Sequence, residues 1–319
     1  MPEQTILLYG GLLLVAGLTV AYIALLVWTP PPIVEHASEK QFRTHSSPKM
    51  PQTLPSLHDE GTLDLTVVVP AYNETKRMPA MLSTAVAHLS GLKDLSFEII
   101  IVDDGSTDGT ADAALQLAAG YARVEIRVVK LEKNLGKGGT VRHGMLHGRG
   151  RRLLMVDADG ASRFEDLDLL WKALDTLPSD DAAGVAIGSR AHLVKTEAVV
   201  KRSFIRNFLM YGLHTVLRIV GVGHIRDTQC GFKLFTRRAA QQIFPRQHLA
   251  TWIFDVELLL LAKQLRIPVM EVPIEWHEVP GSKLNVMSDS LQMLRDLLIL
   301  RVNQLLGRWG AVPERQKVD

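Results

Sequence analysis

Cysteine is almost absent from this sequence, since Cys230 is the only one among 319 residues. A chain with one cysteine has no internal disulfide, which fits a domain in a reducing compartment. An excess of one sign of charge is lacking too. The formal net charge is only +2, which does not indicate a nucleic-acid partner. There is no G-x-x-x-x-G-K-[ST] sequence, and no G-x-G-x-x-G follows the first predicted strand. Nothing therefore suggests a P-loop protein or a dinucleotide-dependent oxidoreductase.

Residues 6–28 contain no charged side chain. A helix over this run spans about 35 Å, enough to cross the hydrocarbon core of a bilayer. Trp28 stands at its end, where aromatic side chains anchor at the interface. The alternative is a cleaved signal peptide, but no basic residue precedes the run and Thr29-Pro30-Pro31-Pro32 is a poor cleavage site. We therefore expect residues 1–29 to be a transmembrane anchor.

The charges beside this run predict its orientation. Only Glu3 precedes it, whereas Lys40, Arg43 and Lys49 follow it. The positive-inside rule then places the N-terminus in the lumen and the rest of the chain in the cytosol. Asn73-Glu74-Thr75 spells a glycosylation sequon, which is used only if that part of the chain is lumenal, so the two interpretations exclude each other.

The chain after the anchor divides into three parts. Residues 30–63 are rich in Pro, Ser, Thr and His without periodicity, which predicts a linker. From 64 to 285, uncharged strands alternate with helices, which predicts an α/β domain with a mostly parallel sheet covered on both faces. The predicted strands are 65–69, 97–102, 124–129 and 152–156. Residues 286–319 form a C-terminal segment that begins with an apolar helix interrupted by charges. This helix, like 204–220, is expected to be amphipathic and interfacial, although a plain core helix explains 286–306 equally well.

Two carboxylates follow the fourth predicted strand. Asp157 and Asp159 are one residue apart, so their side chains point to the same side at the strand end, and Gly160 follows. Hard oxygen ligands of this kind suit Mg²⁺ or Mn²⁺ that substrate phosphates also hold. A turn is the simpler interpretation, because Asp and Gly are common turn residues. Ligands of parallel sheets bind beyond the carboxyl ends of the strands, which favours a site here.

The motifs at the strand ends resemble family-2 glycosyltransferases of the GT-A, Rossmann-like fold over residues 65–281. They are Pro70-Ala71-Tyr72-Asn73-Glu74, Asp103-Asp104-Gly105-Ser106 and Asp157-Ala158-Asp159. Later motifs resemble the branch of that family that glucosylates dolichyl phosphate: Asn134-Leu135-Gly136-Lys137-Gly138-Gly139, Asp227-Thr228-Gln229-Cys230-Gly231-Phe232-Lys233 and Trp252-Ile253-Phe254-Asp255-Val256-Glu257. The resemblance implies inverting transfer of glucose from UDP-glucose to dolichyl phosphate at the endoplasmic reticulum membrane, for N-glycan precursor assembly.

The same resemblance implies a role for each motif residue. The donor would contact Pro70, Tyr72, Glu74, Asp103, Asp104, Lys137, Asp157 and Asp159. A Mg²⁺ or Mn²⁺ ion would bind Asp159 most directly, with Asp157, although Ala161 stands where related enzymes often have another ligand. The acceptor phosphate would contact Arg190, Arg202, Arg206 and Lys283. The catalytic residues would be Asp255, Asp157 and Arg202.

The acceptor also bears on mechanism. A phosphate monoester is mostly a dianion at pH 7, so we expect positioning and charge screening to dominate and Asp255 to orient groups rather than act as a strong base. The alternatives are another polyprenyl-phosphate enzyme, such as a GDP-mannose-dependent mannosyltransferase, or an inactive nucleotide-sugar-binding membrane scaffold. A processive polysaccharide synthase is disfavoured because the Gln-x-x-Arg-Trp signature is absent.

Overall fold

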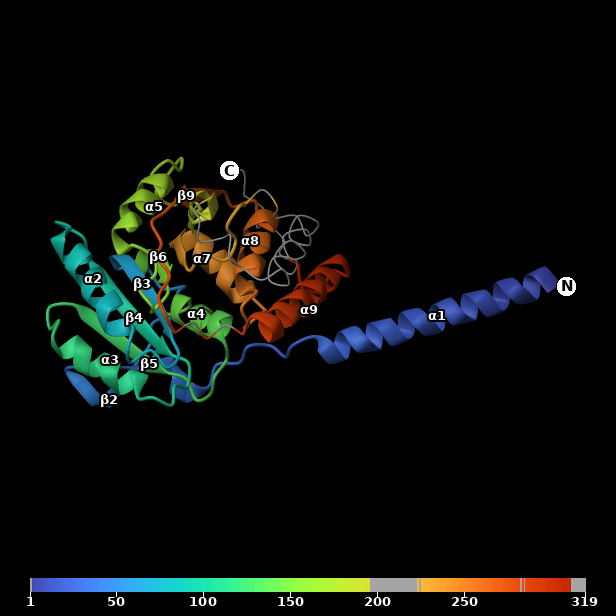
Figure 1. Ribbon diagram of the computed structural model, residues 1–319, viewed down its shortest axis with the longest axis horizontal. Helices are drawn as coiled ribbons and strands as arrows, with labels where there is room; N and C mark the ends of the chain where they lie inside the picture. Colours follow the sequence, from blue (N-terminus) through green and yellow to red (C-terminus); the bar gives the residue numbers. More distant parts are fainter. Residues whose placement is uncertain (1, 196–222, 224, 282, 284, 311–319) are drawn as a thin grey trace.

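The computed structural model describes residues 2–195, 223, 225–281, 283 and 285–310. A single α/β domain carries one long helix, α1 (Pro2–Trp28), which projects away from it (Figure 1). Residues 7–28 have a mean hydropathy of 2.3, and most of them are exposed, although Leu25 near the end of the helix is buried in the domain core. By length and composition this helix can cross a membrane once, as the sequence predicts.

The domain is built on one nine-stranded sheet. Its strands lie in the order β2 (Ser47–Thr53), β1 (Gln41–Thr44), β5 (Glu125–Lys130), β4 (Phe97–Asp103), β3 (Leu63–Ala71), β6 (Gly150–Val156), β8 (Phe232–Thr236), β7 (Val185–Ser189) and β9 (Val269–Pro273). The central strands β5, β4, β3 and β6 are parallel to one another, and β7 is parallel to β9. β8 runs antiparallel to both β6 and β7, and β1 runs antiparallel to β5. The predicted parallel sheet is therefore confirmed at its centre, whereas the reversal at β8 was not predicted.

The four predicted strands, 65–69, 97–102, 124–129 and 152–156, occur close to their expected positions as β3, β4, β5 and β6. The helices after α1 are α2 (Met78–Gly91), α3 (Thr110–Ala119), α4 (Lys137–Met145), α5 (Leu167–Leu174), α7 (Arg237–Ile243), α8 (Phe254–Gln264) and α9 (Val286–Leu305). Short 3₁₀ turns are η1 (Ala37–Lys40), η2 (Phe164–Asp166), η3 (Ala191–Lys195) and η5 (Phe244–Arg246).

Alternation along the central strands fills both faces of the sheet. In β3, Val67 and Val69 pack with α2, α3 and α5, whereas Val68 packs on the opposite face with α4, α7 and α8 (Figure 1). Such two-sided burial explains why the parallel strands are uncharged runs. Because core side chains fill both faces of the sheet, the place left for a functional site is the edge at which the parallel strands end.

The prediction that residues 30–63 are only a linker is corrected by the structure. Part of it forms η1, β1 and β2, and Arg43 of β1 pairs with Val128 of β5. Phe42 and Leu54 are buried in a small core with residues of β4 and β5. β1 has four residues and β2 contains two prolines, and short strands with little periodicity that are stabilised by tertiary packing are hard to recognise from sequence.

α9 lies beside the domain end of α1 (Figure 1). Asn303 Nδ2 donates to Thr29 Oγ1 at 3.2 Å, which ties the two helices together. One face of α9 packs on the core through Leu297 and Leu300, while Leu291 and Leu298 on the other face are more than half exposed. The second predicted amphipathic helix, 204–220, lies outside the described residues.

Candidate active site

Three clusters of polar residues meet at one edge of the sheet. β3 lies between β4 and β6, and all three run parallel, so their carboxyl ends lie side by side. Glu74 follows β3, Asp103 ends β4, and Asp157 follows β6. The sequence prediction that these motifs converge is therefore confirmed by the strand order.

Asp157 and Asp159 have different cationic neighbours. Lys137 Nζ lies 2.6 Å from Asp157 Oδ1, and Arg77 Nη1 lies 3.7 Å from Asp159 Oδ2. Burial and the adjacent Asp157 carboxylate raise the pKa of Asp159. The backbone N–H of Ala161 donates to Asp159 Oδ1 at 3.0 Å, so position 161 contributes through its main chain. Both carboxylates are about one-quarter to one-third exposed and accessible to a ligand.

The two acidic residues fit a divalent cation only as a partial ligand set. They supply hard oxygen donors from one strand end, and no third carboxylate among the described residues completes a metal cluster with them. Mg²⁺ takes one or two carboxylates together with substrate phosphates in many phosphate-handling enzymes. The pair is therefore suited to a cation that arrives with, or is shared by, a nucleotide diphosphate.

Lys137 begins α4 at the end of the glycine-rich loop. Burial disfavours its ammonium, but the carboxylates of Asp157, Asp255 and Asp159 outweigh this and raise the pKa of Lys137. The glycines of the loop serve packing: a Cβ at Gly136 would lie 2.6 Å from the carbonyl oxygen of Ala250. Gly136 also has a φ of 92°, in the region that favours glycine. The loop therefore packs closely on the backbone of Ala250 and Thr251, in the segment that leads to Asp255.

Asp104, predicted as a donor contact, holds this loop in place. Its Oδ1 and Oδ2 accept hydrogen bonds from the backbone N–H groups of Leu135 at 2.7 Å and Gly136 at 3.0 Å. Asp103 accepts from the N–H of Ser106 at 3.1 Å. Burial raises the pKa of both carboxyls. Their contact with a donor stays a prediction.

Glu74 is enclosed by two cations. Arg77 forms a two-point ion pair with its carboxylate, and Lys283 Nζ lies 2.8 Å from Oε1. Lys283 also donates to the carbonyls of Tyr72 and Asn73 and lies 5.7 Å from the Tyr72 ring centre. Lys283, predicted for the acceptor, is thus found against the predicted donor cluster. Pro70 lies within β3, directly before this cluster.

Asp255 is buried at the start of α8 and forms an ion pair with Lys233 of β8. Burial raises the pKa of Asp255, against the opposing effect of Lys233 and Lys137. Lys233 Nζ also donates to the carbonyl oxygen of Cys230 at 2.6 Å. Lys233, which belongs to the 227–233 motif, thus connects this motif to Asp255.

Gly231 of the same motif leaves room for the Asp157 carboxylate. A Cβ at Gly231 would lie 2.0 Å from Asp157 Oδ2.

The predicted acceptor arginines are only partly described. Arg190 follows β7. Its guanidinium donates two hydrogen bonds to Asp227, at 2.7 and 2.9 Å, its backbone N–H donates a third at 2.9 Å, and the guanidinium lies 5.3 Å from the Trp276 ring centre. The guanidinium outweighs burial and lowers the pKa of Asp227. Arg202 and Arg206 lie outside the described residues.

Sequence reasoning missed Arg77, Lys233 and Asp227. The available signal for Arg77 was its position three residues after Glu74, with which it forms an ion pair. Lys233 and Asp227 belonged to a motif that the sequence singled out without giving them roles. Their partners are distant in sequence, so only the fold brings them together.

Fold and site together are those of a GT-A glycosyltransferase. The family model described as Glycosyl transferase family 2 matches residues 66–244. Among solved structures, glucosyl-3-phosphoglycerate synthase from Mycobacterium tuberculosis in complex with uridine diphosphate is similar, with a TM-score of 0.51, 18% identity, and coverage of 80% of this chain and 82% of that one. At this identity the likeness supports the fold alone.

Curated relatives are more similar. A Drosophila melanogaster protein named dolichyl-phosphate beta-glucosyltransferase is 46% identical over 311 residues, covering 96% of this chain and 95% of the relative. Proteins of the same name from Saccharomyces cerevisiae and Homo sapiens are 48% and 44% identical, covering 80% and 88% of this chain and 80% and 87% of theirs. The chain belongs to the dolichyl-phosphate beta-glucosyltransferase family.

Proposed function

We propose that this chain transfers glucose from UDP-glucose to dolichyl phosphate with inversion, giving dolichyl β-D-glucosyl phosphate for N-glycan precursor assembly. The observation that carries the proposal is the near-complete coverage by relatives of that name: the Drosophila melanogaster protein matches 96% of this chain. The acidic edge of the sheet, with Lys137 in front of Asp157, supports it because a nucleotide diphosphate needs cations and metal ligands together.

The donor would bind along that edge. Glu74 and Asp103 offer carboxylates near strand ends for the uracil N–H or ribose hydroxyls. Lys137 would contact the diphosphate, exchanging part of its ion pair with Asp157 for the phosphate oxygens. Asp157 and Asp159 would hold Mg²⁺ or Mn²⁺, which supplies Lewis-acid neutralisation of the charge that develops on the leaving UDP.

The acceptor side would use positive charge rather than a strong base. Arg190, Arg202 and Arg206 would hold the lipid phosphate, which is mostly a dianion at pH 7. Asp255, buried against Lys233, would orient Lys137 and the donor sugar. Displacement at the anomeric carbon then requires mainly alignment of two bound substrates, which is worth several kcal/mol on its own.

The membrane would present the lipid acceptor. α1 would anchor the chain in the endoplasmic reticulum membrane, with the N-terminus lumenal and the domain cytosolic. The exposed apolar face of α9, beside the end of α1, would lie in the bilayer interface. A site at the membrane surface suits a substrate whose phosphate is in the headgroup layer.

The decisive experiment is product formation by the purified full chain from labelled UDP-glucose and dolichyl phosphate. We expect product with Mg²⁺ or Mn²⁺, none with chelator, and recovery when metal is restored. GDP-mannose in the same assay should give no product. Product from GDP-mannose alone would assign a mannosyltransferase, and UDP binding without any turnover would indicate a scaffold.

A further inference from the structure

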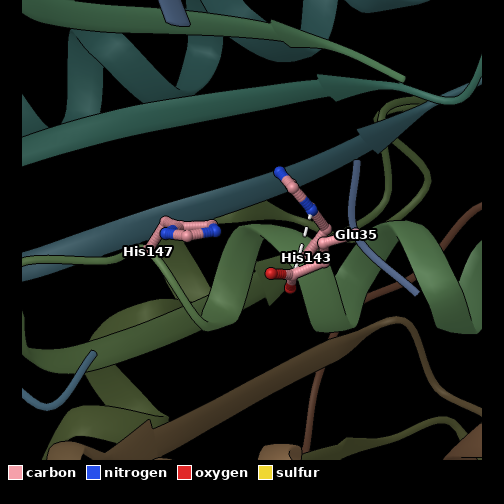
Figure 2. A group of neighbouring side chains, drawn as sticks. All are labelled: Glu35, His143 and His147. Atoms are coloured by element: carbon pink, nitrogen blue, oxygen red, sulfur yellow. Dashed lines mark ion pairs between the residues drawn. The ribbon is translucent and has the colours of Figure 1, made fainter. Parts of the chain in front are cut away.

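A second group of potential ligands lies away from the active-site edge, between the segment that follows α1 and the end of α4 (Figure 2). Its members are Glu35, His143 and His147, and one ligand atom of each lies within 4.8 Å of the others. His143 is in the last turn of α4, and His147 lies just beyond that helix. Both imidazoles are buried, and the Glu35 side chain is 16% exposed.

The polar atoms of this cluster face one another without hydrogen bonds. Glu35 Oε1, His143 Nδ1 and His147 Nε2 are buried and have no hydrogen-bond partner among the described residues. Glu35 Oε1 and His143 Nδ1 are 3.8 Å apart, the contact drawn in Figure 2. Buried polar atoms almost always have a hydrogen-bond partner, because leaving one without a partner is destabilising, so three together are unusual unless they share a ligand.

The opposite ring nitrogens fix the protonation of both histidines. His143 Nε2 lies 2.9 Å from the carbonyl oxygen of Glu39, and His147 Nδ1 lies 2.6 Å from that of Pro55. A carbonyl only accepts, so these nitrogens carry the protons and the lone pairs fall on His143 Nδ1 and His147 Nε2. Histidine ligands of metal ions are typically oriented by such a hydrogen bond from the second nitrogen. Burial also favours the neutral form of both imidazoles, since it lowers the pKa of His143 to about 4 and lowers the pKa of His147.

The surrounding charges do not forbid a cation. Lys40 Nζ lies 3.7 Å from Glu35 Oε2 and Arg142 Nη1 lies 3.6 Å from Oε1, both longer than hydrogen bonds. The carboxylates of Glu35 and the buried Glu39 balance these two cations. The carboxyl end of α4 also directs its dipole favourably toward positive charge.

We propose that Glu35, His143 and His147 bind one divalent transition-metal ion of the Zn²⁺ class, with water completing the tetrahedron. Two imidazoles and a carboxylate are donors that Zn²⁺ accepts, whereas Mg²⁺ prefers an all-oxygen shell. Ligands at about 2.1 Å from one tetrahedral ion are about 3.4 Å apart, whereas these three atoms lie within 4.8 Å of one another, so a movement of about 1 Å or less at each ligand atom closes the site. The ion would fasten the segment after the membrane helix to α4, which begins at Lys137.

The test is Zn²⁺ binding by the full chain in detergent, stripped with chelator and titrated against a chromophoric chelator. We expect one Zn²⁺ per chain, unaffected by millimolar Mg²⁺, and a loss of at least 10-fold in affinity in both His147→Gln and Glu35→Gln. His58→Gln, an exposed histidine, and Asp159→Asn, at the active-site edge, should bind as the unaltered chain does. Glu35→Gln keeps the side-chain shape, so it decides the matter if the histidine variants fail to fold.

Hydrogen exchange supplies a second measurement. Zn²⁺ should slow exchange over residues 33–44 in the unaltered chain and not in Glu35→Gln. Equal Zn²⁺ affinity in the unaltered chain and Glu35→Gln, or loss of binding in Asp159→Asn alone, would overturn the assignment. Binding without protection of residues 33–44 would overturn the fastening role. None of these outcomes depends on glucosyl transfer.

Discussion

At the scale of single residues, Asp157 and Asp159 differ despite their shared strand end. Asp157 forms an ion pair with Lys137 and Gly231 leaves room for it, whereas among the described residues the cation paired with Asp159 is Arg77, at 3.7 Å. Asp159 therefore has the freer oxygen to offer a metal ion that arrives with the donor.

Asp159→Asn should lower kcat/KM for UDP-glucose by about 100-fold or more, because an amide would replace the proposed anionic metal ligand and about 3 kcal/mol of charge stabilisation would be lost. Steady-state kinetics over a range of Mn²⁺ concentrations would measure this. Asp181→Asn, at an exposed ion pair with Arg238, is the matched control and should be unchanged. Wild-type kinetics in Asp159→Asn would remove the carboxylate from the metal site.

Asp255 tests whether a strong base is needed. Replacing Asp255 alone leaves the Lys233 ammonium buried and unpaired, so the double variant Asp255→Asn/Lys233→Met is the better probe. We expect turnover to fall by no more than about 100-fold, with an unchanged pH profile, because the acceptor phosphate is already a dianion. A loss of several orders of magnitude that deepens at low pH would identify Asp255 as a general base.

At the scale of elements, the segment between the anchor and β3 belongs to the domain. Phe42 of β1 is 3% exposed, and the Arg127 guanidinium lies 4.4 Å from its ring centre. A flexible tether would contribute nothing to the free energy of unfolding, whereas a packed segment would. The stability of a Phe42 variant therefore distinguishes a tether from a part of the domain.

Phe42→Ala should lower the free energy of unfolding by about 3 kcal/mol, through lost burial and the cavity left behind. Met50→Ala, at an exposed position of β2, should change it by less than about 0.5 kcal/mol. Denaturant unfolding of both variants in one detergent gives the comparison. Equal stability of the two would restore the tether interpretation.

α9 combines a buried face with an exposed apolar one. Cys230 is buried, and burial raises the pKa of its thiol to about 11, so a second cysteine can be labelled selectively. A polarity-sensitive dye on Leu298→Cys should emit at shorter wavelength in nanodiscs than the same dye on Ser288→Cys, nearer the start of the helix. Identical spectra at the two positions would place α9 away from the bilayer.

At the scale of the whole molecule, orientation decides which substrates reach the site. The sequon at Asn73 lies in the cluster after β3, and Asn73 Oδ1 accepts a hydrogen bond from the Thr107 N–H at 2.9 Å. In sealed microsomes we expect protease to cleave the domain without detergent, and glycosidase to leave its mobility unchanged. A protected, glycosylated domain would reverse the topology inferred from Lys40 and Arg43.

The sequence alone determined what depends on short-range pattern. Charge-free length predicts α1, the runs around Val67 and Ile100 predict β3 and β4, and the alternation with helices predicts which motifs end together. The motif order also pointed to the family that the relatives bear out. These features follow from local periodicity and from the common geometry of parallel strands.

Only the tertiary structure decided which charges meet. Lys233 reaches Asp255 because β8 reverses direction beside β6, and Lys283 reaches Glu74 across more than two hundred residues. The β1 pairing and the facing of Glu35 with His143 likewise depend on long-range packing that no local pattern records. Side-chain partners are a property of the folded surface, because burial and distance, which set their energies, exist only once distant segments are in contact.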